Sequence, residues 1–314
     1  MSRQYRFLQL DVFTSRALSG NPLAVFPEAE GISDREMQQI AREMNLSETV
    51  FVLPPSDDEK ALRRLRIFTP GRELPFAGHP VVGTWNALAR EGVVPLPEGG
   101  SGWMRIQQEV GIGILPVDVE FKEGEPVRVV MTQGKFEAQA VMEDAHERAE
   151  IERGLGLAPE DFDESLPIQT ISTGITTLAV PVRSLEALGR CRVDATVLCE
   201  AYGRAGAGSC YAFTRETMEG GEAQAHARLF APDYGIPEDP ATGSASGSLS
   251  GYLVHHGALS VEPAEGVFRF VIEQGDFMER PSRISAEVKG ARGMVEQVRI
   301  GGPSVVVARG ELIL

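Results

Sequence analysis

Residues 228–257 read RLFAPDYGIPEDPATGSASGSLSGYLVHHG, which is a strand-like start, an acidic loop and a run of small residues that opens an apolar helix. Small residues at a helix start leave backbone N–H groups accessible, and the helix dipole adds partial positive charge there. This stretch therefore predicts a place that attracts a carboxylate or a developing oxyanion.

An earlier stretch repeats this pattern. Residues 66–70 read RIFTP, and residues 228–232 read RLFAP. A second proline follows five residues after each stretch, at Pro75 and Pro237, and a helix that ends at a glycine comes next. Position 228 lies 162 residues after position 66, which is about half of the 314-residue chain. Matched offsets followed by matched elements favour an ancient duplication that produced two similar domains.

The order of the expected elements indicates an α+β fold with mainly antiparallel sheets. Strands are expected at residues 49–53 and 63–68, and a capping box at Ser33 and Glu36 predicts a helix that ends near Asn45. Regular alternation of strands and helices is missing, so a parallel doubly wound sheet is disfavoured.

The composition bounds the class of protein. A net charge of −15 disfavours a nucleic-acid partner. No run approaches the roughly 18 apolar residues of a membrane span, and the N-terminus lacks the apolar core of a signal peptide. The three cysteines form no CxxC pair and have no histidine at metal-ligand spacing. We therefore expect a cytoplasmic protein with no membrane partner, no disulfide framework and no metal site.

The duplication predicts two helix starts that face each other across a cleft between the domains, and such clefts commonly hold small ligands. The residues expected there are Glu48, Gly78 and His79 from the first half and Asp239, Gly243 and Ser244 from the second. Two carboxylates, an imidazole, a hydroxyl group and two sets of backbone donors suit proton transfer on a small anionic molecule.

Glu48 stands between the end of a helix and an apolar run. Apolar surroundings make a carboxylate a stronger base, and Phe51 and Phe76 are the neighbours expected to supply them. The alternative is a solvated loop carboxylate. His79 would lie at the positive end of a helix, which favours a neutral ring at pH 7, and a purely structural hydrogen bond is its alternative.

Other chemistries fit the sequence less well. The runs GSASG at 243–247 and GSLSG at 247–251 place Ala245 and Leu249 where a nucleophile elbow requires serine. The chain has no GxxxxGK[ST] loop and no complete dinucleotide fingerprint.

Several short motifs, spread over nearly the whole chain, carry a resemblance to a known family. They are DVFT at 11–14, GNP at 20–22, NLSET at 45–49, FAGHP at 76–80, STG at 172–174, EDPATGSA at 238–245, QG at 274–275 and RPS at 280–282. With them the sequence resembles the PhzF-like (phenazine biosynthesis-like) proteins, within the diaminopimelate epimerase fold.

The resemblance implies two pseudosymmetric domains, each a curved, mostly antiparallel sheet around a central helix. The domains are expected at 1–128 and 129–302, with 303–314 returning to the first. Members are commonly homodimers and need neither a metal nor an organic cofactor.

The resemblance also implies an isomerase. In the characterised member a glutamate takes a proton from carbon of a dihydro-hydroxyanthranilate and returns it elsewhere on the same face. That glutamate matches Glu48, and the substrate-contacting histidine and aspartate match His79 and Asp239. The expected substrate-binding set is Asn21, Ser47, Gly78, Gly243 and Ser244.

Two alternatives stay open. An amino-acid epimerase would use Glu48 with a second base, but the fold's two-thiol epimerases carry cysteines at both helix starts. Residues 77–79 (AGH) and 241–243 (ATG) contain no thiol, and burial is the expected role of Cys210. The other alternative is a non-catalytic small-molecule-binding protein that keeps the fold.

Overall fold

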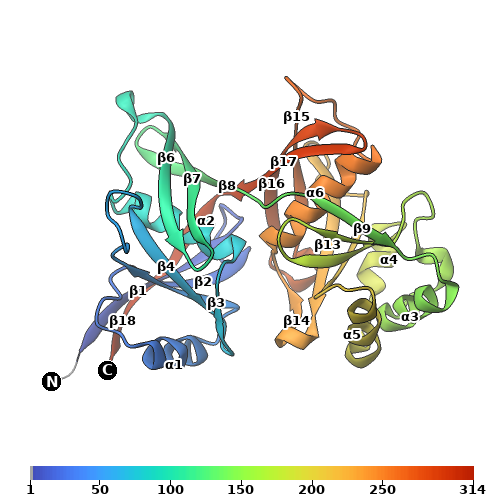
Figure 1. The fold of residues 1–314 in the computed structure, drawn as a ribbon, viewed down its shortest axis with the longest axis horizontal. Helices are drawn as coiled ribbons and strands as arrows, with labels where there is room; N and C mark the ends of the chain where they lie inside the picture. The colour runs from blue at the N-terminus through green and yellow to red at the C-terminus, as the bar shows by residue number, and fades with distance from the viewer. Residues whose placement is uncertain (1–2) are drawn as a thin grey trace. The chain divides into compact units, whose positions relative to one another are not determined.

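The computed structural model describes residues 3–314, which divide into two units (Figure 1). Unit 1 comprises the described residues up to Thr132 together with Gly301–Leu314, and unit 2 comprises Gln133–Ile300. The boundaries expected from the sequence were after residues 128 and 302. Each unit combines a mainly antiparallel sheet with a few helices, as the sequence predicted.

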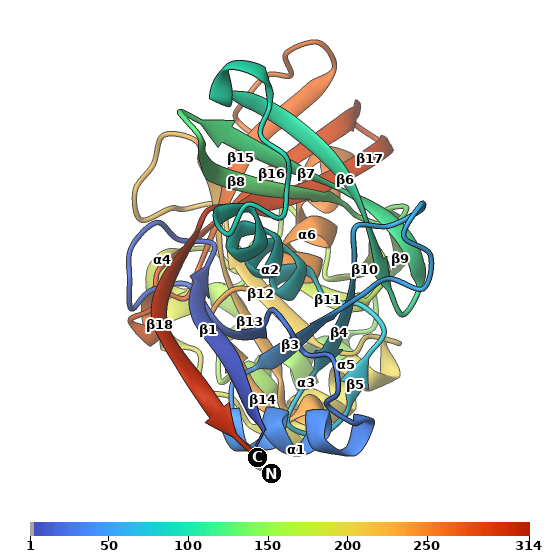
Figure 2. The ribbon, with the colours of Figure 1, turned by 90° about the vertical axis from the view of Figure 1, so that its left-hand side faces the viewer.

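Unit 1 is built on a sheet that begins and ends with the two ends of the chain. Its strands are β18 (Ser304–Ile313), β1 (Gln4–Val12), β2 (Asn21–Phe26), β3 (Glu48–Leu53), β4 (Arg63–Phe68), β6 (Gly102–Val110), β7 (Gly113–Lys122) and β8 (Glu125–Thr132). They pair in that order up to β8, with β2–β3 and β4–β6 parallel and the other pairs antiparallel. Figure 2 shows β18 alongside β1, so the last strand of the chain completes this sheet.

Unit 2 repeats this order. Its strands are β9 (Glu137–Val141), β10 (Gln169–Ser172), β11 (Thr176–Pro181), β12 (Cys210–Thr214), β13 (Ala223–Ala231), β15 (Val267–Gln274), β16 (Ser282–Ala291) and β17 (Met294–Gly302), the last two residues of which belong to unit 1. From β9 to β16 they pair in sequence, with β11–β12 and β13–β15 parallel and the other pairs antiparallel. The same senses at the same places confirm the predicted pair of similar units.

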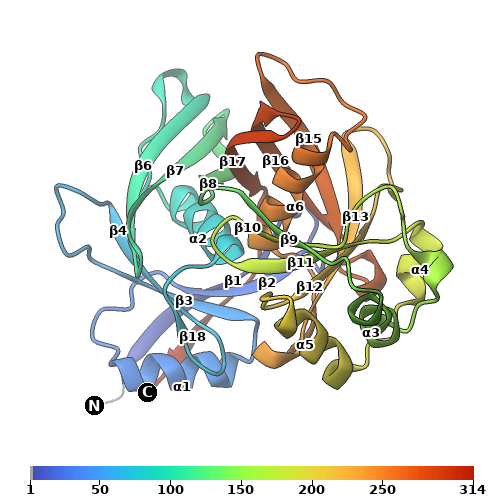
Figure 3. The ribbon, with the colours of Figure 1, turned by 45° about the vertical axis from the view of Figure 1, so that its right-hand side comes forward.

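A central helix lies against the sheet of each unit. In unit 1, α2 (Gly78–Arg90) contacts β1, β2, β3, β7, β8 and β18, and every residue from Gly78 to Ala89 is buried. In unit 2, α6 (Gly243–His256) contacts β10, β11, β15 and β16 (Figure 3). Both helices are buried along nearly their whole length, which confirms the predicted sheet around a central helix.

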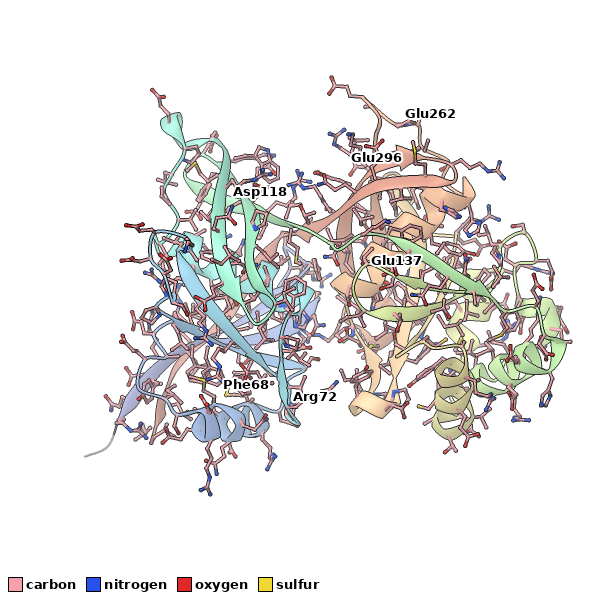
Figure 4. All side chains as sticks on the ribbon, viewed as in Figure 1. Phe68, Arg72, Asp118, Glu137, Glu262 and Glu296 are labelled. Carbon is pink, nitrogen blue, oxygen red and sulfur yellow. The ribbon has the colours of Figure 1, made fainter. Side chains whose placement is uncertain are left out.

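The other helices cover the outside of the units. α1 (Asp34–Met44) begins with the predicted capping box of Ser33 and Glu36 and ends at Asn45 in the left-handed conformation. Its buried residues pack with Phe26, Phe51 and Phe68, and Figure 4 shows Phe68 near this helix.

Residues 3–314 contain three more α-helices and four single-turn helices, which lie in the connections between strands. They are α3 (Ala145–Leu155), α4 (Leu185–Arg190), α5 (Ala195–Arg204), η1 (Glu98–Gly100), η2 (Pro159–Asp161), η3 (Pro232–Tyr234) and η4 (Asp276–Met278). Within the described part of the chain, no helix is both long enough and apolar enough to cross a membrane.

The repeated Arg-aliphatic-Phe motif has a structural role in both units. Arg66 binds Glu73 through two hydrogen bonds of 2.8 and 2.7 Å, and Arg228 binds Glu238 through two of 2.8 Å. Glu73 lies on the short strand β5 (Glu73–Leu74), and Glu238 lies on β14 (Ile236–Asp239). Both strands lead into a central helix, so each bidentate pair fixes the segment that positions a helix start.

Candidate active site

Glu48 is the first residue of β3. Its side chain is 11% exposed to solvent. Side chains alternate between the two faces of a strand, so residues 48 and 50 share one face while residues 49 and 51 share the other. Phe51 packs against Phe26 and Phe68 beneath α1. The expectation that Phe51 surrounds Glu48 is therefore wrong, because residues three apart in a strand point to opposite faces.

His79 is the second residue of α2, and it meets Glu48 within unit 1. The distance from His79 Nε2 to Glu48 Oε2 is 3.3 Å, and the His79 side chain is 6% exposed. Burial lowers the pKa of His79 from 6.5 to about 3. The ring is therefore neutral at pH 7, so the contact is an approach of an uncharged ring to the carboxyl group rather than a pair of full charges. The sequence analysis predicted the neutral ring, but it attributed this to the helix dipole, whereas the structural cause is burial.

Asn21 determines which ring nitrogen of His79 carries the proton. Its amide Nδ2 lies 3.4 Å from His79 Nδ1, and Asn21 has no exposed surface. An amide N–H that donates to Nδ1 makes that nitrogen the acceptor, so the proton of the neutral ring resides on Nε2. Nε2–H then faces Glu48. The 3.3 Å separation is long for a hydrogen bond, and catalytic hydrogen bonds often tighten only when substrate is present.

The starts of α2 and α6 differ from those of the other α-helices. Side chains cap the first turns of α1, α3, α4 and α5. At α2 and α6 the N-cap residues are Ala77 and Thr242, and neither side chain caps the described first turn. The N–H groups there remain available to another acceptor, such as a carboxylate. Gly78 and Gly243 open these two helices, as the sequence predicted.

The remaining predicted site residues lie in two local groups, one in each unit. Ser47 precedes Glu48 in the loop between α1 and β3 and is half-buried. Asp239 ends β14 and is 6% exposed, and its carboxylate accepts a hydrogen bond from the Thr242 hydroxyl. Gly243 and the half-buried Ser244 follow within the same turn. Direct contact of these residues with a substrate stays a prediction.

The family model described as phenazine biosynthesis-like protein matches residues 10–310. The chain belongs to the phenazine biosynthesis-like family. An isomerase of Clostridium acetobutylicum that is called uncharacterised is 36% identical over 314 residues, covering 100% of both chains. The trans-2,3-dihydro-3-hydroxyanthranilate isomerase of Pseudomonas aeruginosa is 35% identical, covering 99% of this chain and 100% of that protein. The crystal structure of a PhzF-family phenazine biosynthesis protein from Bacillus anthracis is 28% identical with a TM-score of 0.86, covering 99% and 100%.

This phenazine biosynthesis-like chain carries an acidic side chain at the start of β3 in unit 1 but not at the corresponding place in unit 2. Glu48 pairs with Leu23 across parallel strands, and Cys210 pairs with Leu178 in the same arrangement. Cys210 is wholly buried in an apolar cluster, and burial raises the pKa of its thiol. The two halves of the fold are therefore chemically asymmetric at this position.

Two residues that organise the turn before α6 were not among the predicted site residues. Gln274, at the end of β15, and Thr242 both bond to Asp239. The available signal was their place in two short motifs, QG at 274–275 and EDPATGSA at 238–245. Among the described residues, no group of three or more His, Cys, Asp or Glu side chains is arranged to hold a metal ion.

Proposed function

We propose that this chain is an isomerase that moves a proton between two carbons of a small carboxylate-bearing metabolite, and that Glu48 carries the proton. The observation that carries this proposal is the buried carboxyl group of Glu48 beside the neutral ring of His79. Family membership supports the reaction class, since the similar Pseudomonas aeruginosa protein is named an isomerase of trans-2,3-dihydro-3-hydroxyanthranilate.

In the proposed step, the Glu48 carboxylate takes a proton from a carbon of the substrate. The electrons of the broken C–H bond move into the conjugated system, and Glu48 then returns the proton to another carbon. The same residue removes and returns the proton, so the step needs neither a metal nor an organic cofactor. His79 keeps its proton on Nε2 and acts as a neutral hydrogen-bond donor near the reacting atoms.

The helix starts provide the anion binding that this chemistry requires. The uncapped first turn of α2 presents N–H groups in the same unit as Glu48, which contacts His79 of that turn. Removing one preorganised donor of this kind typically slows catalysis by about 10²–10³. We propose that the substrate is an unsaturated cyclic carboxylate, because one base reaches two carbons most simply across a conjugated ring. The roles of Asp239, Gly243 and Ser244 toward the same molecule belong to the proposal, as do a homodimer and a cytoplasmic location.

The asymmetry of the two units supports one base rather than two. A racemase that uses two bases needs an acid–base group on each face of the reacting carbon. Cys210 replaces the carboxylate at the corresponding position of unit 2 and is buried in the core, and neither helix start carries a thiol. An amino-acid epimerase is therefore the weaker hypothesis.

Replacing Glu48 tests the proposal. Wild type and Glu48→Gln are incubated with trans-2,3-dihydro-3-hydroxyanthranilate in D2O, and proton NMR follows isomerisation and deuterium uptake. We expect turnover by the wild type, no detectable turnover by Glu48→Gln, and similar anthranilate binding by both proteins. Glu43→Gln, which changes an exposed glutamate of the same unit, is the matched control. Equal rates for wild type and Glu48→Gln would refute the mechanism, and loss of chirality at Cα of an amino acid would favour the epimerase.

A further inference from the structure

One buried side chain holds both ends of the turn between Asp239 and Thr242. Gln274 is the last residue of β15 and has no exposed surface. Its Nε2 donates to the backbone oxygen of Asp239 at 2.7 Å and to Thr242 Oγ1 at 3.2 Å. Its Oε1 accepts from the backbone N–H of Thr242 at 3.1 Å. The amide group therefore uses its donor side and its acceptor side on the same turn.

These contacts set the direction of the next hydrogen bond. A hydroxyl group has one proton to give, and the amide Nε2 can only donate. Thr242 Oγ1 accepts from Gln274, so its own proton is directed to Asp239 Oδ2, to which it is hydrogen-bonded. Gln274 therefore orients the Thr242 hydroxyl group, and this hydroxyl group donates to the carboxylate of Asp239.

A second buried side chain, that of Tyr211, holds the Gln274 amide in place. The hydroxyl of Tyr211 donates to Gln274 Oε1 at 2.8 Å, and Tyr211 lies 2.8 Å from Ser246 Oγ. Tyr211 and Ser246 have no exposed surface. Burial raises the pKa of Tyr211, so its phenol keeps the proton that it donates. Tyr211, Gln274, Thr242 and Asp239 form one connected set, called here the Gln274 network.

We infer that Gln274 is a positioning residue, which acts through Thr242 to hold the Asp239 carboxylate in the orientation that the reaction requires. This inference rests on the proposed function, because that function is what gives Asp239 a substrate to contact. A displaced catalytic group lowers the rate even when the fold is intact, and an error of about 1 Å can cost about 10²-fold.

The first test compares two buried glutamines. Gln274→Met removes the network's amide, and Gln224→Met removes a buried amide whose Oε1 accepts from Ser260 N at 2.9 Å and Ser260 Oγ at 2.7 Å. We expect kcat to fall about 10²-fold in Gln274→Met with a smaller change in KM, and to stay near the wild-type value in Gln224→Met. Melting temperatures of both variants are measured to check that they fold. Equal kcat values for the two variants would overturn the inference.

The second test uses Thr242. Thr242→Ser keeps the hydroxyl group and should keep most of the activity, whereas Thr242→Val should lose about as much as Gln274→Met. Because both residues act on Asp239 through the same bond, the Gln274→Met/Thr242→Val double variant should be little worse than either single variant. Fully additive losses, or an inactive Thr242→Ser, would show that the two residues do not act as one unit.

The third test changes only the donor. In Gln274→Glu, an ionised carboxylate still accepts from Thr242 N–H and Tyr211 but cannot donate to the Asp239 backbone oxygen or to Thr242 Oγ1, whereas the protonated acid can donate to one of them. Burial raises the pKa of such an introduced acid. We expect the variant's kcat, relative to wild type, to fall as pH rises through that pKa. A constant ratio across the pH range would contradict the donor role.

A measurement independent of turnover separates this inference from the proposed function. The Thr242 N–H donates to Gln274, so its hydrogen exchange should be slow in wild type and Gln224→Met and at least about tenfold faster in Gln274→Met. If the wild type does not isomerise the substrate but this difference appears, the proposed function fails and the network stands. If the wild type turns over and exchange at Thr242 is unchanged by Gln274→Met, the network fails and the function stands.

Discussion

His79 is held neutral by burial and is supplied with a defined tautomer by Asn21, and both effects come from residues that need not touch the substrate. A neutral imidazole that presents Nε2–H to a carboxyl group can donate a hydrogen bond without adding charge to the site. This arrangement leaves Glu48 as the group that gains and loses the proton in the proposed step.

Changing the tautomer of His79 should impair the site without altering its shape. Asn21→Asp replaces a donor with an acceptor, which draws the ring proton to Nδ1 and leaves a lone pair on Nε2 facing Glu48. We expect kcat to fall by at least about 10²-fold, since holding the wrong tautomer in a catalytic triad costs even more. Nitrogen-15 NMR of the ring reports the tautomer directly.

Asn86→Asp is the control for that substitution, because Asn86 is also fully buried in unit 1 and lies on α2 away from the His79 ring nitrogens. Full activity in Asn21→Asp together with a moved ring proton would show that the tautomer does not matter.

The lowered pKa of His79 predicts a pH dependence of stability. The folded ring has a pKa of about 3 and the unfolded ring about 6.5, so below pH 6.5 the unfolded state binds the extra proton. Stability from this group is complete above pH 6.5 and is lost as pH falls toward about 3. Between pH 7 and pH 5 the loss should be about 2 kcal/mol.

Urea denaturation of wild type and His79→Gln at both pH values measures this loss. The free energy of unfolding should fall more steeply in wild type, because the variant lacks the titrating ring. An equal loss of unfolding free energy between pH 7 and pH 5 in both proteins would mean that the pKa of His79 is not lowered in the folded protein.

At the scale of elements, alanine substitution at two glycines with positive φ distinguishes the energetic cost of backbone strain from the cost of close packing. Gly275 has φ +85°, and an added Cβ would lie 2.4 Å from Arg280 O and 2.5 Å from Pro240 O. Gly266 has φ +74° with nothing within 4 Å. Both alanine variants bear about 1–2 kcal/mol for the left-handed conformation. Gly275→Ala should cost about 1–3 kcal/mol more, because backbone atoms must move apart.

Thermal and urea unfolding of the two variants provide this comparison. Gly275 directly follows Gln274 of the Gln274 network, so Gly275→Ala should reduce kcat while Gly266→Ala should not. Equal destabilisation by the two substitutions would show that the turn adapts to the added methyl group.

The elements show which parts of the structure local sequence determines. The ends of α1 were predictable, since the capping box at Ser33 and Glu36 and the left-handed Asn45 act within a few residues. The repeated motif was enough to predict two similar units. Strand alternation alone could also have predicted that Phe51 and Glu48 lie on opposite faces of the strand.

The rest depends on contacts between distant parts of the chain. Gln274 bonds to residues more than 30 positions away, and its strand gives no local sign of that partner. Likewise, the cause of the lowered His79 pKa is burial by surrounding elements, which no local motif encodes. Glu48 and His79 were expected in one site because of the predicted duplication, and Asn21 was expected to bind substrate, but the contact of Asn21 with His79 Nδ1 emerged only from the fold.

At the scale of the whole molecule, each unit contains one strand that directly follows the eight strands of the other repeat in the chain. One neighbour of β1 is the last strand of the chain, and one neighbour of β10 is the strand that directly follows the first repeat of eight strands. β18 pairs with β1, and β9 pairs with β10. A cut between residues 143 and 144 therefore leaves each half with the strand that the other half's sheet lacks. We expect that neither half folds fully alone and that mixing the two halves restores cooperative melting. Circular dichroism measures the melting.

The control for that experiment is a second half that ends at residue 302, which lacks β18. It should complete unit 2 with the first half but leave unit 1 unstable, and hydrogen exchange in β1 (Gln4–Val12) should stay fast. Cooperative melting of either isolated half at the temperature of the intact chain would contradict the expected dependence.

The pairing of β9 and β18 also bears on the ancestry of the chain. Each repeat of eight strands is followed by a ninth, and each ninth strand completes the sheet of the other repeat. Two separate copies of a half-length ancestor would have made the same exchange as a domain-swapped homodimer. Fusing two such copies would place both exchanged strands within one chain. In such a chain, deleting either repeat with its ninth strand removes a strand from the sheet of the other. The reactive groups of the two repeats can still differ, as Glu48 opposite Leu23 and Cys210 opposite Leu178 do.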